Sequence, residues 1–97
     1  MSEFSVKSSD LRSNANLLND YLQKFQKEQG NLTGAEQTLM KGFQGDAAVT
    51  FDKNYKELEA KMTNFATVVS EYITKLNEEA EAYDKADIAA TNVAGTK

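Results

Sequence analysis

The sequence lacks cysteine, histidine, tryptophan and proline altogether. Without cysteine it can form no disulfide, no thiolate metal site and no cysteine nucleophile. Without histidine it has neither the usual general base nor the commonest metal ligand, and the Glu-x-x-His motif of di-iron bundles is excluded. Without proline, no residue removes a backbone donor from a long helix. We therefore expect a helical protein that is not an enzyme and holds no metal or cofactor.

Dense basic blocks and long apolar runs are also absent. The net charge of the 97-residue chain is −4, from 15 acidic and 11 basic side chains, whereas a duplex-binding protein needs a basic face. No window approaches the ~18 apolar residues of a membrane span, and the first residues carry no run of signal-peptide length. We expect one domain over residues 1–97, no nucleic-acid partner, no membrane span and, if the protein is secreted, export without a Sec-type signal peptide.

What the chain does have is helical periodicity. Ser8, Ser9 and Asp10 are good N-cap types in front of an apolar pattern that steps by four and three residues along one helix face. One register contains Leu11, Leu18, Phe25, Leu32 and Leu39, and the other contains Ala15, Leu22, Gln29, Glu36 and Phe43. The pattern predicts a first helix over about residues 8–41.

Gly30 and Gly34 leave two alternatives for this helix. Each glycine costs about 1 kcal/mol relative to alanine in a helix interior, and Thr33 with Glu36 makes a capping-box pattern that could start a new helix. Alternatively the helix is continuous and the glycines allow another helix to approach closely. The heptad keeps its phase across both glycines, so we favour continuity.

Gly42 and Gly45 predict a turn over residues 42–46, because glycine closes a helix in the left-handed conformation without steric cost. Asp46 is then a natural N-cap. A second helix follows over about residues 47–87, and the small, polar residues 88–97 are expected to form a flexible tail. One register of this second helix contains Phe51, Leu58, Phe65, Tyr72 and Glu79. The other contains Tyr55, Met62, Val69, Leu76 and Tyr83.

The predicted fold is all-α: an antiparallel helix-turn-helix hairpin. Its apolar stripe is wider than a two-helix seam requires, so we expect two hairpins to associate into a four-helix bundle. The predicted hairpin and dimer core consists of Leu18, Leu22, Phe25, Leu32, Phe51, Leu58, Phe65, Val69 and Tyr72.

Two short motifs are candidates for function. Phe43-Gln44-Gly45 has an ordinary interpretation as an aromatic packed at a helix end, and a functional one as an aromatic presented for recognition. Tyr83 and Asp87 project from one helix face at four-residue spacing, and alone they would be a terminal core tyrosine with a chance carboxylate. Each motif is weak by itself, and their joint placement is more specific.

A helical hairpin of about a hundred residues, with an aromatic-x-glycine turn near its middle and a Y-x-x-x-D/E near its end, resembles the WXG-hundred (ESAT-like) family. The resemblance covers roughly residues 8–87. It implies a small protein exported by a type VII secretion system as a homodimeric or heterodimeric four-helix bundle. It further implies that the turn motif of one subunit lies near the C-terminal motif of its partner, and that the secretion ATPase reads this composite signal.

Carried over residue by residue, the resemblance assigns Phe43 and Gly45 to the turn motif, and Tyr83 and Asp87 to the secretion signal. The chain departs from the family at Phe43, which stands where the family name has tryptophan. Phenylalanine keeps the aromatic packing but loses the indole N–H donor. That loss removes any hydrogen bond made by the indole, and it is compatible with a divergent branch of the family.

Several functions remain open at this stage. The first is an exported type VII substrate, either an effector or a structural partner of the apparatus. The second is an adaptor that pairs with a larger type VII toxin and supplies its export signal, with Gly30, Gly34, Gln29 or Glu36 specifying the partner. A cytoplasmic helical bundle without an export role is a third. An enzyme would need a convergent polar constellation, and the sequence contains none.

Overall fold

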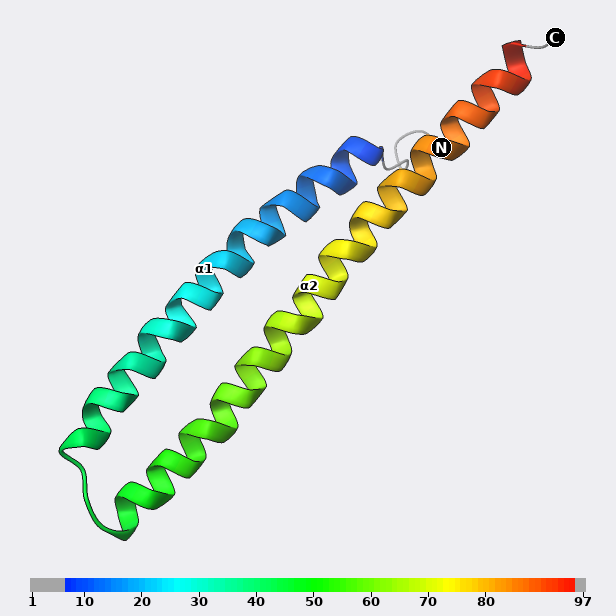
Figure 1. Cartoon of the computed structure of the whole chain (residues 1–97). Helices are drawn as coiled ribbons and strands as arrows, with labels where there is room; N and C mark the ends of the chain where they lie inside the picture. The colour runs from blue at the N-terminus through cyan, green and yellow to red at the C-terminus, as the bar shows by residue number, and fades with distance from the viewer. Residues whose placement is uncertain (1–6, 96–97) are drawn as a thin grey trace. The chain divides into compact units, whose positions relative to one another are not determined.

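The computed structural model describes the backbone of residues 7–95 and the side chains of residues 7–86. It contains two helices, α1 (Ser8–Lys41) and α2 (Asp46–Gly95), joined by a short turn (Figure 1). The chain divides into two compact units, each with a segment of both helices running antiparallel side by side. We call Tyr21–Val69, which includes the turn, the tip unit, and Met1–Asp20 with Ser70–Lys97 the terminal unit. The predicted helical hairpin is confirmed.

Helix α1 begins one residue after its cap. The backbone carbonyl of Lys7 accepts hydrogen bonds from the amides of Asp10 and Leu11, at 3.0 and 3.2 Å, so Lys7 occupies the N-cap position. The Lys7 amide in turn donates to Asp10 Oδ2 at 3.3 Å, which is the reciprocal half of a capping box. The prediction of Ser8, Ser9 or Asp10 as the cap was therefore close in position but wrong in residue.

Helix α1 runs unbroken through Gly30 and Gly34 to Lys41. A Cβ built at either glycine meets no atom within 4 Å, so no other described part of the chain packs closely there. Helix α2 passes the expected boundary at residue 87 and ends at Gly95. Ala86, Ala89 and Ala90 explain the extension, because alanine is the strongest helix former and nothing after residue 87 breaks the helix.

The core along the helix seam consists mainly of small residues. The buried apolar side chains are Ala15, Leu22, Ala48, Tyr55, Ala66 and Ala80. No large side chain is fully buried in the part of the chain that the structure describes. Each unit therefore buries little apolar surface, and large apolar side chains are left at the outside. Neither helix, over its described residues, is apolar enough along a sufficient length to cross a membrane.

Candidate functional site

The turn motif is built around Gly45. This glycine has a φ of +94°, which L side chains rarely adopt. Its carbonyl accepts hydrogen bonds from the amides of Ala48 and Val49, at 3.1 and 3.2 Å, so Gly45 is the N-cap of α2. The prediction of Asp46 as the N-cap was wrong: Asp46 is the first residue of α2, where its negative charge is favoured by the helix dipole.

Phe43 lies in the turn between α1 and α2 and is half-buried. Its ring packs against that of Phe51 in the second turn of α2, with centroids 5.9 Å apart and an interplanar angle of 56°. The contact fixes the aromatic at the end of the tip unit while leaving part of its surface accessible. The ordinary interpretation of this motif, an aromatic packed at a helix end, is therefore confirmed, and its role in recognition stays a prediction.

The C-terminal motif lies on α2 in the terminal unit. Tyr83 is 51% exposed, so its ring does not belong to the core of the single chain. The backbone of Asp87 belongs to α2, but its side chain lies outside the described residues. The turn motif and the C-terminal motif belong to different units of the chain.

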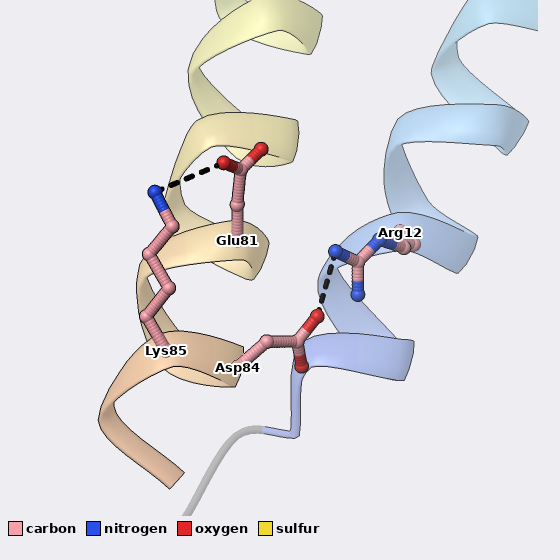
Figure 2. A network of polar contacts seen from close by, with 4 residues as sticks. All are labelled: Arg12, Glu81, Asp84 and Lys85. Atoms are coloured by element: carbon pink, nitrogen blue, oxygen red, sulfur yellow. Dashed lines mark ion pairs between the residues drawn. The ribbon is translucent and has the colours of Figure 1, made fainter. Parts of the chain in front are cut away.

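Asp84, inside the C-terminal motif, makes an ion pair that sequence reasoning missed. Arg12 of α1 donates from Nη2 to Asp84 Oδ2 at 2.8 Å (Figure 2). Hydrogen bonds from Ser8 and from Arg12 lower the pKa of Asp84 below its ordinary value of 3.8. Lys85 pairs with Glu81 along α2 at 3.2 Å instead (Figure 2). An antiparallel register with residue 12 opposite residue 84 was the one signal that could have predicted this pair.

The residues predicted to form the core divide into two groups. Leu22 is buried, and Leu18, Phe25 and Val69 are half-buried. The remaining five are exposed, between 43% and 56%: Leu32, Phe51, Leu58, Phe65 and Tyr72. Within one chain these five do not form a core, because the seam is filled by the smaller side chains that lie next to them on each helix. Their proposed burial in a dimer stays a prediction.

Six apolar side chains of the tip unit follow one face at seven-residue spacing. The rings of Phe25 and Phe65 meet edge to face, with centroids 5.3 Å apart. Because the helices are antiparallel, a seven-residue step in each direction places Leu32 level with Leu58, and a second step places Leu39 level with Phe51. We call these six residues the apolar face of the tip unit.

Polar side chains occupy the seam of the tip unit next to this face. Gln29 donates from Nε2 to Thr63 Oγ1 at 3.0 Å. Thr33 Oγ1 lies 2.7 Å from the Tyr55 hydroxyl and donates to Glu59 Oε2 at 2.8 Å. The sequence pattern singled out Gln29 and Glu36 as polar seam residues that could specify a partner. In the structure both contact α2 of the same chain, and their α2 neighbours were not anticipated.

Comparison with known families gives one match. The sequence model of WXG100, described as proteins of 100 residues with WXG, matches residues 3–88, which is most of the chain. No curated protein and no solved structure gives a significant match. The matched range contains Phe43, Gly45, Tyr83 and Asp87.

Proposed function

The chain belongs to the WXG100 family of small secreted helical proteins, and from this we propose that it is a type VII secretion substrate exported as a folded dimer. Family membership carries the proposal, because members are substrates of a dedicated secretion system and typically pair as dimers. An exposed Tyr83 and a partly accessible Phe43 support it, since both rings can be contacted by a receptor without unfolding the chain.

The proposed export signal combines Phe43 and Gly45 with Tyr83 and Asp87. In the arrangement that the family implies, the turn of one subunit lies near the C-terminal motif of its partner. A homodimer would carry two such composite surfaces, each available to the secretion ATPase. Phenylalanine at position 43 offers an apolar contact without a donor, so recognition at the turn rests on packing.

Export from the native host tests this proposal. We expect wild type in the culture medium, and Tyr83→Ala and Asp87→Ala retained in the cell pellet with helical circular dichroism spectra like that of wild type. Tyr21→Ala is the matched control, because Tyr21 is 57% exposed, against 51% for Tyr83, but lies on α1 outside both motifs. Deletion of the secretion ATPase should retain wild type as well.

Two outcomes would contradict the proposal. Secretion that persists without the ATPase would exclude the type VII route. Retention of wild type in a host that exports its other type VII substrates would exclude an independent substrate. Retention that is relieved by co-expression of a larger type VII toxin would support the adaptor function in its place.

A further inference from the structure

Glu36 is the most unusual ionisable residue in the tip unit. Its side chain projects from α1 into the helix seam and is only 9% exposed. Its Oε2 atom has no hydrogen-bond partner among the described residues. An acidic group in such a place is costly when ionised unless a cation or several donors compensate it. Glu36 therefore needs an explanation beyond helix propensity.

The groups that face Glu36 come from α2. Asp52, Lys56 and Glu59 line the same cavity of about 350 Å³, together with the neutral Thr33, Gln37, Met40 and Tyr55. Lys56 Nζ lies 3.0 Å from Asp52 Oδ2. Lys56 is the one cationic residue that lines the cavity, and it pairs with Asp52. The Glu59 carboxylate accepts a hydrogen bond from Thr33. Ionised Glu36 would thus add a third carboxylate to a site with one cation.

Protonation resolves this conflict. Burial raises the pKa of Glu36 above its ordinary value of 4.5, and a hydrogen bond to Asp52 raises it further. A hydrogen bond from Lys56 lowers the pKa of Asp52, and the one from Glu36 lowers it too. The raised pKa of Glu36 and the lowered pKa of Asp52 both fit one arrangement, in which protonated Glu36 donates a hydrogen bond to ionised Asp52 across the seam. The described acidic groups do not form a metal site.

We propose that Glu36 and Asp52 form a proton-operated latch between α1 and α2, which holds the tip unit closed while Glu36 is protonated and loosens it when Glu36 ionises. The latch is a regulatory device that goes beyond the proposed export function and does not depend on it. It rests on a buried carboxyl group with an unpartnered oxygen, on the carboxylates of Asp52 and Glu59 across the seam, and on the engagement of Lys56 with Asp52.

The direction of the pH dependence follows from the linkage between proton binding and folding. Because the pKa of Glu36 is raised in the folded state, its contribution to stability is fully present below its unfolded pKa and is lost as pH rises through the folded pKa. The lowered pKa of Asp52 has the opposite effect: its contribution is present above its unfolded pKa and is lost as pH falls through the lowered value. The latch is therefore tightest between the two folded pKa values.

Carboxyl carbon-13 NMR on the labelled full chain tests the latch directly. We expect Glu36 to titrate with a midpoint above 4.5 and Asp52 with a midpoint below 3.8. Amide hydrogen exchange, corrected for the intrinsic pH dependence, then reports opening of the seam. Protection of residues 33–40 should fall as pH rises through the folded midpoint of Glu36, by about tenfold for each pH unit by which that midpoint exceeds its unfolded value.

Glu36→Gln separates the latch from a general pH effect. Glutamine keeps a donor toward Asp52 but does not titrate, so protection of residues 33–40 should stay high and constant as pH rises through the midpoint measured for wild-type Glu36. Glu57→Gln, an exposed change on α2, should behave like wild type. A Glu36 midpoint at or below 4.5 overturns the latch, and so does an unchanged pH profile in Glu36→Gln. The titration uses the unaltered protein and decides the question even if the variant does not fold.

Discussion

At the scale of single residues, Gly30 and Gly34 make the protein less stable than alanine would at the same positions. Both lie inside α1 with open space where a Cβ would be. We expect Gly30→Ala and Gly34→Ala each to stabilise the protein by about 1 kcal/mol, because alanine restricts the unfolded chain and favours the helix. Urea unfolding followed by circular dichroism measures this.

The same two variants also test why glycine is there. If a partner helix packs closely at these positions, alanine would stabilise the hairpin but weaken association, and sizing at decreasing concentration would show it. A loss of stability in the monomeric chain would contradict the prediction.

Gly45 is the opposite case, because its backbone conformation requires glycine. Its φ of +94° is strained for any L side chain, so we expect Gly45→Ala to destabilise the protein by about 1–2 kcal/mol. Gly42→Ala is the matched control: Gly42 also has open space around it, and Gly45 is the one glycine with positive φ among the described residues. Equal stability of the two variants in urea unfolding would argue against a strained turn.

At the scale of elements, the ion pair of Arg12 with Asp84 connects the first turns of α1 to α2. Both side chains are about half exposed, at 45% and 41%, so the pair is screened by solvent and its effect is local. We expect Asp84→Asn to reduce amide protection of residues 11–15 several-fold at low salt, and much less in high salt. The lowered pKa of Asp84 predicts that wild type keeps this protection above pH 3.8 and loses it as pH falls through the folded pKa.

Glu81→Gln is the control for the ion pair, because the salt bridge of Glu81 is with Lys85 on the same helix. It should leave the start of α1 unchanged. A reduction in Glu81→Gln equal to that in Asp84→Asn would mean that general charge, and not the pair, protects α1. Because Asp84 is engaged with α1, we also expect Asp84→Asn to leave export unchanged, in contrast to Tyr83→Ala.

The helices themselves could be predicted from the sequence more fully than the seam between them. Helix α1 and the turn agree with the apolar periodicity and the glycines, and the whole-chain periodicity indicates a hairpin. The apolar pattern predicted that Leu32 and Leu39 point inward, but both are exposed. Gln29 and Glu36, which the second register placed inward, do lie on the inward side of α1, whereas Thr33 lies there in place of Leu32, because a second step of four residues rotates the seam.

Hydrophobic periodicity could not find that rotation, because the side chains that follow it are polar. Thr33 forms hydrogen bonds with Tyr55 and Glu59 on the other helix, and Glu36 faces Asp52 there. Their burial depends on a register that no local pattern specifies. The ion pair of Arg12 with Asp84 escaped prediction for the same reason. The aromatic turn and the Tyr83 motif are local in sequence, and resemblance to a family was enough to find them.

At the scale of the whole molecule, the apolar face of the tip unit predicts self-association. Phe51, Leu58 and Phe65 are 43% to 55% exposed, while no large described side chain is fully buried in the single chain. If a second copy of the chain packed its apolar face against this one, the large apolar side chains would no longer be exposed and would form a buried core. We expect wild type to sediment as a dimer of the 10.7 kDa chain.

Leu58→Glu should dissociate this dimer. A charge placed at the centre of the face cannot be solvated once the face is covered, so we expect association to weaken by about 2 kcal/mol or more, roughly thirtyfold in Kd. Val49→Glu is the matched control, since Val49 is 70% exposed and the nine-residue step to Leu58 is about two and a half turns, which places it on the opposite side of α2. Sedimentation equilibrium of both variants, with circular dichroism to confirm helicity, measures the difference. Equal Kd values would place the interface elsewhere, and a monomeric, fully helical wild type would exclude the homodimer and leave a heterologous partner for the apolar face.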